Sequence, residues 1–390
     1  MIVIEIIVLI LLVIYSLNVF FYLFYAIAGL LGKKKTFPYR EPQIRFCVMV
    51  PAYKGDNVII HSVTENLKQK YPKHLYDIYV IADSFKPETL EKLKQYNANV
   101  IEVFFENSTK AKSINKAFEV IEERYDYVVL LDVDNVMEVD FLQKLNNRLV
   151  KDVQILQAHR VALNSDSSYA ILDGISEEIA NHIFRKGHAA IGFSSALIGS
   201  GMAVGFRFFK DTMKDINAVG GFDKELEVLV IRRRIRIHWL EDAYVYDEKV
   251  QEAEIYQKQK LRWISAQLFY LRKYFFTIFT TGIFRGNFDY ADKVFQQTLI
   301  PRVLLLGSLF LITLVINLVA PQLYGAAWIT IFALTIFTLA ICVPRKYYTK
   351  ETLKAMATLP QAFFIFFINL FRLKGANKKF IHTPHGTKKN

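Results

Sequence analysis

The chain has 390 residues, of which 53% are hydrophobic, 14% aromatic and 22% charged, and its mean hydropathy is +0.20. This composition excludes a disordered chain, a collagen and an ordinary soluble enzyme. A chain this apolar is expected to have much of its surface in contact with lipid. The net charge of +12 suits nucleic acid, anionic lipid or an anionic substrate as partner, so the location of the charge must decide. Cys47 and Cys342 lie far apart and predict neither a disulfide framework nor a CxxC metal site.

The first element in chain order is an apolar run from Ile2 to Leu31, which ends at a lysine triplet, 33–35. A spanning helix needs about 20 apolar residues. No basic residue precedes the run, and it is longer than the apolar core of a signal peptide, so we expect an anchor that is not cleaved. The lysines place the chain that follows in the cytosol by the positive-inside rule. We therefore predict a transmembrane helix over 1–32.

Residues 44–255 have a different pattern, with short apolar runs between amphipathic segments. Three predicted strands cover 46–50, 78–82 and 127–131, and they end at Pro51, Asp83 and Asp132; helices are predicted over 58–69, 87–95, 112–124 and 141–149. This alternation indicates an α/β domain with a mainly parallel sheet. Ligands of such sheets bind at the carboxyl ends of the strands, where we expect a nucleotide site.

The segment Asp132-Val133-Asp134 follows the third predicted strand. In an extended segment its two carboxylates would point the same way, and hard oxygen donors so placed hold Mg²⁺ or Mn²⁺ on a diphosphate. The same residues are also typical of a simple turn. No G-x-G-x-x-G opens the first helix and no P-loop motif occurs, which disfavours dinucleotide-binding and P-loop enzymes.

The C-terminal part returns to apolar sequence after Gln259-Lys260-Leu261-Arg262-Trp263 and a stretch rich in aromatic residues. That stretch predicts amphipathic interfacial helices within 256–300, and 303–343 predicts a transmembrane hairpin. The next apolar stretch, 353–372, is predicted to be interfacial or re-entrant, because a full crossing would place the basic tail, 373–390, outside the cell. The predicted cytosolic domain is thus enclosed by membrane segments.

The order of these motifs resembles membrane-embedded family 2 glycosyltransferases, the processive type that includes cellulose, chitin and hyaluronan synthases. The resemblance covers nearly the whole chain and implies a GT-A-like nucleotide-sugar-binding domain between the membrane segments. It implies that the nucleotide-sugar is held by residues in four segments of this chain: Pro51, Ala52, Tyr53 and Asp56; Asp83, on the uracil edge; Lys110, near the diphosphate; and Asp132.

The same resemblance assigns the metal and the acceptor end. Asp134, with Asp132, matches the D-x-D motif that holds the divalent ion. Five further residues match the acceptor and diphosphate motifs: Ser200 and Gly201 in a glycine-containing loop, and Gln259, Arg262 and Trp263 of Q-x-x-R-W. Physically, Arg262 suits a leaving diphosphate and Trp263 a sugar face; by themselves, both residues also suit a membrane-proximal helix.

The general base implied by the resemblance is Asp223, since its distances to the following motifs match those of the family. Phe222 stands where the family has a second acid, and Glu225 and Glu227 are the alternatives for the base. An inverting transfer needs one carboxylate beside the acceptor hydroxyl. As a plain structural feature, all three acids would form the solvated start of a helix.

The implied function is an inverting integral membrane transferase of the inner or plasma membrane, with a cytosolic catalytic domain. It uses a UDP-sugar and Mg²⁺ or Mn²⁺ to extend a polysaccharide. The alternatives are single transfer to a lipid-linked acceptor and a non-catalytic nucleotide-sugar-binding subunit of an export complex. The basic cluster 232–236 lacks a nucleic-acid fold signature, so we expect membrane lipid and no nucleic acid as partner. The few spans make a homo-oligomer or an export partner an open prediction.

Overall fold

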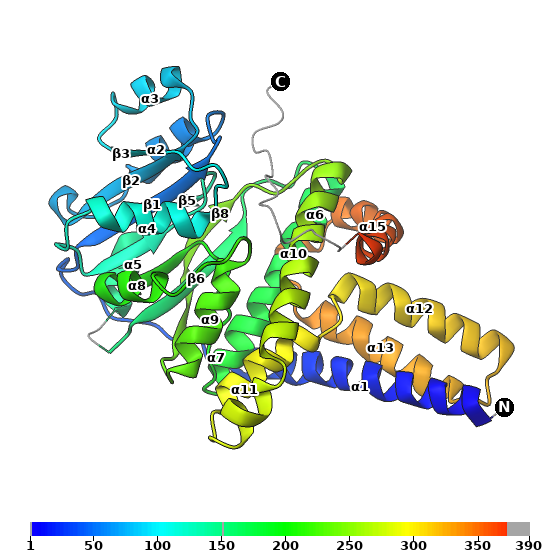
Figure 1. Ribbon diagram of the computed structural model, residues 1–390. Coiled ribbons are helices and arrows are strands. Elements are labelled where there is room, and N and C mark those ends of the chain that lie inside the picture. Colours follow the sequence, from blue (N-terminus) through cyan, green and yellow to red (C-terminus); the bar gives the residue numbers. More distant parts are fainter. Residues whose placement is uncertain (1, 150–151, 373–390) are drawn as a thin grey trace.

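The computed structural model describes residues 2–149 and 152–372, so the predicted tail 373–390 lies outside the described residues. Its centre is an eight-stranded sheet with the strand order β3-β2-β1-β4-β7-β6-β8-β5 (Figure 1). The strands are β1 (Phe46–Tyr53), β2 (Tyr76–Asp83), β3 (Asn99–Val103), β4 (Tyr127–Leu130), β5 (Val136–Met137), β6 (Ile155–Ala162), β7 (Met202–Gly205) and β8 (Ile237–Asp247).

Both faces of the sheet are buried, as the continuous apolar strands require. In β1, Val48 and Val50 belong to one core cluster, whereas Cys47 and Met49 belong to another. Successive side chains of a strand point to opposite faces, so a central strand such as β1 contributes to both clusters. The helices of the domain are α2 (Ile59–Asn66), α3 (Pro87–Leu93), α4 (Lys110–Val120), α5 (Phe141–Arg148), α6 (Ser168–Ala180), α7 (His188–Ala190), α8 (Phe206–Met213) and α9 (Phe222–Arg232), with the 3₁₀ turn η1 (Lys73–Leu75) and the π-helix η2 (Asn181–Gly187).

The predicted α/β class is confirmed, and the strand pairing is mainly parallel, although the sheet also contains antiparallel strands. Strand β1 pairs in parallel with β2 and β4, and β6 pairs in parallel with β8. Strand β7 runs antiparallel between β4 and β6, and β5 is antiparallel to β8. Between β6 and β7 the chain leaves the sheet through α6, η2 and α7. It then re-enters in the opposite direction, which an apolar strand pattern does not encode.

Three apolar helices project together from one side of the sheet domain: α1 (Ile2–Leu31), α12 (Arg302–Val319) and α13 (Gly325–Ile341) (Figure 1). Among the described residues, α1 and α12 are long and apolar enough to cross a membrane, judged by length and composition; α13 is apolar but shorter, with 17 residues. Their inner side chains form a core cluster that includes Tyr22, Leu309 and Trp328. These helices coincide with the apolar runs of the sequence.

The remaining helices connect the sheet to this group. They are α10 (Ala253–Tyr274), η3 (Ile278–Ile283), α11 (Phe288–Phe295), η4 (Gln296–Thr298), η5 (Arg345–Tyr347), α14 (Lys350–Met356) and α15 (Leu359–Phe371). Helix α10 begins at Ala253, just before the predicted boundary at 255. Helices α14 and α15 meet at a bend of 43°. They would count as a third span only if the bent pair were one membrane segment. Helix α15 packs on α10 and α12, and its interfacial or re-entrant placement stays a prediction.

Candidate active site

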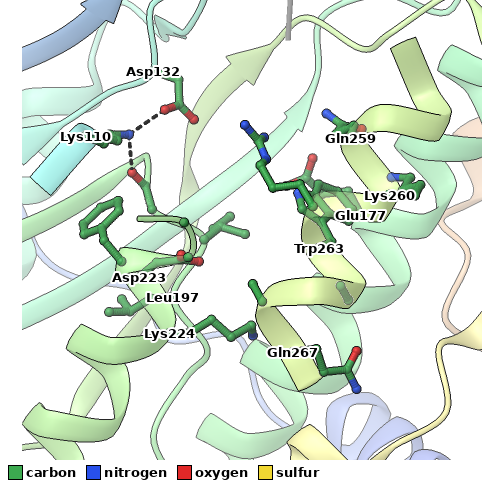
Figure 2. A pocket seen from close by; sticks show the side chains of 18 of the residues that line it. Lys110, Asp132, Glu177, Leu197, Asp223, Lys224, Gln259, Lys260, Trp263 and Gln267 are labelled. Carbon is green, nitrogen blue, oxygen red and sulfur yellow. Dashed lines mark hydrogen bonds and ion pairs between the residues drawn. The ribbon is translucent and has the colours of Figure 1, made fainter. Parts of the chain in front are cut away.

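One cavity of about 510 Å³ lies between the carboxyl ends of the central strands and helices α9 and α10, and it reaches α1, α12 and α15. Figure 2 shows Lys110, Asp132 and Asp223 on one side and Gln259 and Trp263 of α10 on the other. Eleven of the predicted residues line it: Pro51, Ala52, Tyr53, Asp83, Lys110, Asp132, Asp134, Asp223, Gln259, Arg262 and Trp263. Segments far apart in sequence therefore meet at one site.

One end of the cavity is formed by the ends of β1 and β2, where Tyr53 and Asp83 are paired in the parallel register. Asp83 is 1% exposed; its Oδ1 accepts a hydrogen bond from the Ser84 hydroxyl at 2.9 Å. Its Oδ2 is buried and has no hydrogen-bond partner in the part of the chain that the structure describes. A buried carboxylate oxygen without a donor is costly, so this oxygen is suited to accept from a ligand N–H.

Asp56, the fourth residue of the predicted base-binding segment, does not line the cavity. Its Oδ1 accepts a hydrogen bond from the backbone N–H of Lys86 at 2.9 Å. Lys86 immediately precedes α3, which begins at Pro87. Asp56 therefore connects the loop after β1 to the loop after β2, and its observed contact is structural.

The two acids of the D-x-D segment line the cavity, and of the two conformations that the sequence left open the segment adopts the turn and not the extended one. The backbone N–H of Asn135 donates to the carbonyl of Asp132 at 3.1 Å, and the Asn135 side chain accepts from the Asp132 N–H at 3.1 Å. The turn is favoured because the Asn135 side chain accepts a hydrogen bond from a backbone N–H at the point where strand pairing has ended. Asp134 is 6% exposed. Two carboxylates beside a cavity fit a divalent ion that takes its other ligands from phosphate and water.

Lys110, the first residue of α4, pairs with Asp132 on the same side of the cavity (Figure 2). Its Nζ lies 2.5 Å from Asp132 Oδ1 and donates to the carbonyl of Gly199 at 2.7 Å. Thr109 caps the helix by accepting from the Lys112 N–H, so the Lys110 side chain begins at a fixed helix end. The ammonium group therefore lies beside the acid that would face a diphosphate.

Sequence reasoning missed a buried ionic network behind Asp132. Arg160 Nη1 lies 3.6 Å from Asp132 Oδ2 and 3.7 Å from Asp247 Oδ1, and Arg160 Nε donates to Glu177 at 2.7 Å. Lys249 pairs with Glu177 and Asp247. Burial opposes ionisation of Asp247, but Arg160 and Lys249 hold its pKa below the ordinary value. The sequence feature that could have indicated this network is Arg160, a charged residue within the buried strand Ile155–Ala162.

The three acids of α9 have different surroundings. Asp223 lines the cavity, whereas Glu225 pairs with Lys273 and Glu227 lies 2.9 Å from Lys293. Poor hydration in the enclosed cavity raises the pKa of Asp223; Lys224 opposes this rise and Glu227 adds to it. In the part of the chain that the structure describes, Asp223 is therefore the α9 acid at the cavity that forms no ion pair with a lysine.

Helix α10 presents the Q-x-x-R-W residues to the same cavity. Burial lowers the pKa of Arg262, while the charges of Asp132 and Asp223 raise it, so its guanidinium is within electrostatic reach of both acids. Between these residues, Lys260 is 2% exposed, pairs with Asp173 and lies 3.7 Å from the ring centroid of Trp263. The Lys260–Asp173 pair therefore fixes the face of α10 that meets the cavity.

Ser200 and Gly201, the predicted acceptor loop, lie behind the wall of the cavity rather than in it. Ser200 is fully buried, and its hydroxyl accepts from Arg160 Nη1 at 3.2 Å. The Gly201 N–H donates to the carbonyl of Leu130, which joins the loop to β4. Their neighbours Ile198 and Gly199 line the cavity instead.

Comparison with known proteins identifies the fold and the family. The sequence model described as "Glycosyltransferase like family 2" matches residues 42–266, more than half of the chain. No curated protein matches. Among solved structures, the mannosyltransferase PcManGT from Pyrobaculum calidifontis in complex with GDP-Man and Mn²⁺ is 14% identical, with 86% of this chain and 97% of that chain covered and a TM-score of 0.55. S. aureus TarS 1-349 in complex with UDP-GlcNAc is 15% identical, with 86% and 91% covered and a TM-score of 0.44.

Proposed function

The chain belongs to glycosyltransferase family 2, and from this premise we propose that it transfers a sugar, with inversion, from a UDP-sugar to an acceptor hydroxyl. The observation that carries the proposal is the meeting of Asp83, Lys110, Asp132, Asp223 and Arg262 around one cavity. Asp83 supplies an acceptor for a base N–H, and Lys110 and Arg262 supply cations for a diphosphate. Asp132 supplies an acid for a metal, and Asp223 a base for the reacting hydroxyl. A pocket with such convergent groups is the expected place for the reaction.

The donor end is proposed to lie along β1 and β2. Tyr53 provides an aromatic face beside the cavity, and the buried Oδ2 of Asp83 accepts the N–H of the uracil edge. Lys110 and Arg262 then face the diphosphate, where their charges offset the negative charge of the leaving group. UDP is therefore the product that remains at this end after transfer.

A divalent ion would be held by Asp132 and Asp134, and when bound it would supply positive charge to the diphosphate. The donor set supports this role, because carboxylate oxygens suit Mg²⁺ or Mn²⁺. The PcManGT complex contains Mn²⁺, which makes Mn²⁺ the first ion to test. In this arrangement Arg160 holds Asp132 from behind, at 3.6 Å, and so positions one of the two acids.

Asp223 is proposed to take the proton of the acceptor hydroxyl. The freed oxygen attacks the anomeric carbon, the new glycosidic C–O bond forms as the bond from that carbon to the diphosphate oxygen breaks, and UDP leaves. The raised pKa of Asp223 makes its ionised form a stronger base. Glu225 and Glu227 are the poorer candidates, because each is held by a lysine on another helix.

Extension of a polysaccharide is the proposed outcome, supported by the position of Q-x-x-R-W on the cavity wall. Single transfer to a lipid-linked acceptor is the second candidate. A specific observation favours it: the cavity continues to Tyr22 of α1, Val303 of α12 and Phe366 of α15. The two outcomes share one chemistry, because a saccharide that grows on a lipid carrier would use the same site.

We further propose that α1 and the hairpin of α12 and α13 anchor the protein in the inner or plasma membrane, with the sheet domain in the cytosol. The lysine triplet after α1 and the exposed apolar side chains of these helices support this orientation. Few spans are present, so export of a long product would require a second copy or another protein. Protease protection of the sheet domain in sealed inverted vesicles would contradict this orientation.

The test is UDP release by the purified, detergent-solubilised protein with a panel of UDP-sugars, GDP-mannose and Mn²⁺ or Mg²⁺. Asp134→Asn should abolish release, whereas Asp211→Asn, at an exposed acid of α8 that pairs with Lys214, should leave it unchanged. Activity with one UDP-sugar would establish the donor. Metal-dependent UDP binding without release, whatever donor or lipid acceptor is added, would favour the non-catalytic subunit instead.

A further inference from the structure

Two arginines line the end of the cavity that faces the apolar helices: Arg185 of η2 and Arg302, the first residue of α12. Within residues 2–149 and 152–372, neither guanidinium has a carboxylate oxygen within 4.0 Å. Guanidiniums removed from water normally require an anion, because the desolvation of the charge must be offset. Two such groups at one place indicate a missing anionic ligand.

Arg185 is 3% exposed, and the hydrogen bonds it donates within the described residues go to neutral acceptors. Its Nε donates to the carbonyl of Ala196 at 3.2 Å and its Nη1 to Asn181 Oδ1 at 2.7 Å. Burial lowers the pKa of Arg185 to about 10; Glu177 opposes this shift, and Arg160 and Arg302 add to it. Glu177 does not neutralise Arg185, because it is already held by Arg160 and Lys249.

Arg302 lies close enough to Arg185 for the two positive charges to repel. Its Nη2 donates to the carbonyl and the hydroxyl of Ser176, at 2.9 and 3.0 Å. Its Nη1 is buried and has no hydrogen-bond partner among the described residues. A buried guanidinium donor without a partner, beside a second cation, is suited to the oxygens of a phosphate.

The walls around these arginines are largely apolar. They include Tyr22 of α1, Phe184 of η2, Leu299, Val303 of α12 and Phe366 of α15. Helix α12 is one of the two helices that are long and apolar enough to cross a membrane. The site therefore combines cations for an anionic headgroup with an apolar surface that continues toward the lipid-facing helices. A free phosphate would leave this apolar surface without a partner.

We infer that the acceptor is a lipid-linked phosphate whose phosphate group binds Arg185 and Arg302 and whose apolar chain lies along α12 and α15. The inference rests on the proposed transferase function and names the chemical class of its acceptor. A carrier whose phosphate is substituted by a sugar would place that sugar toward Asp223. The hydroxyl proton then passes to Asp223 as the new glycosidic bond forms, and UDP departs from the other end of the cavity.

The experiment measures acceptor binding and donor binding separately, on the full chain in phosphatidylcholine nanodiscs. A fluorescent polyprenyl phosphate is the probe; the matching polyprenol and inorganic phosphate compete. Arg302→Gln and Arg185→Gln should each weaken probe binding roughly tenfold or more, because each removes a charged hydrogen-bond donor. Arg302→Lys should restore part of the affinity. The control is Arg345→Gln, at an exposed arginine of η5 outside the cavity.

The affinity for UDP should change less than twofold in these variants, which also shows that they are folded. Polyprenyl phosphate that competes while polyprenol does not would support the inference. Equal competition by inorganic phosphate would overturn the lipid part of it, and transfer to a soluble oligosaccharide with no probe binding would overturn it entirely. Failure of the protein to bind UDP would instead refute the proposed function, so the two failures are distinguishable.

Discussion

Replacement of Asp223 by asparagine tests the assignment of the general base most directly. Asparagine has the same shape and keeps the contacts of the side chain with the cavity wall, but it cannot take a proton from a hydroxyl at neutral pH. Loss of a positioned general base costs about 10²- to 10⁴-fold in rate, or about 2.7–5.4 kcal/mol at about 1.36 kcal/mol per factor of ten. We expect this loss in kcat, with little change in KM for the UDP-sugar.

The same substitution should raise the thermal stability of the protein. Burial raises the pKa of Asp223 in the folded chain, so the native state binds this proton more tightly than the unfolded state does. The contribution of Asp223 to the free energy of unfolding therefore falls as the pH rises from the ordinary aspartate pKa to the raised one. This destabilisation persists at neutral pH. Asparagine carries no charge and removes this loss, so the Tm at pH 7 should be higher than in the wild type.

The raised pKa also predicts the pH dependence of the wild-type rate. Activity needs ionised Asp223, so the acid limb of kcat/KM should lie above the pH at which an ordinary aspartate titrates, near 3.9. The assay is UDP release across the pH range, with thermal unfolding followed in the same detergent. The matched control is Glu225→Gln, which removes an acid of the same helix that pairs with Lys273.

The opposite pair of outcomes would exclude Asp223 as the general base. If Asp223→Asn kept more than a tenth of the wild-type rate while Glu225→Gln abolished activity, the base would be Glu225. Equal loss in both variants with lower Tm would indicate damage to α9 rather than to catalysis. A lower Tm for Asp223→Asn alone would contradict the desolvation of its carboxylate.

Three further predictions concern other parts of the site. Gly199→Ala should lower the rate and destabilise the chain by about 1–2 kcal/mol, because Gly199 has φ +76° and a Cβ there would lie 3.2 Å from Phe222 and 3.4 Å from Asp223; an unchanged Tm and rate would contradict this. Lys260→Met should cost about 3–5 kcal/mol in thermal unfolding, since it leaves Asp173 buried without its partner, and adding Asp173→Leu should recover part of the loss. Removal of divalent ions by EDTA should stop UDP release and Mn²⁺ or Mg²⁺ should restore it; persistent activity would exclude a metal role for Asp132 and Asp134.

The sequence by itself determined the features that depend on local composition. The apolar run Ile2–Leu31 forms one helix, as its length and its apolar side chains alone predict. The short apolar runs predicted strand ends at Pro51 and Asp83; β2 does end at Asp83, whereas β1 continues two residues further, to Tyr53. Parallel pairing then places these ends at one edge of the sheet. The α/β class was therefore predictable, and most of the predicted site residues line the cavity.

Tertiary structure alone decided which of several similar side chains faces the cavity. Asp223 and Glu225 are two residues apart, yet Lys273 from α10 forms its ion pair with Glu225 and not with Asp223. Asp56 accepts from the Lys86 N–H instead of facing the cavity, and the direction of β7 depends on the path of α6 and η2. Arg185 and Arg302 lie 117 positions apart in the printed sequence, and their meeting at one cavity comes from helix packing. Pairing energies between distant segments set these outcomes, and no local pattern carries that information.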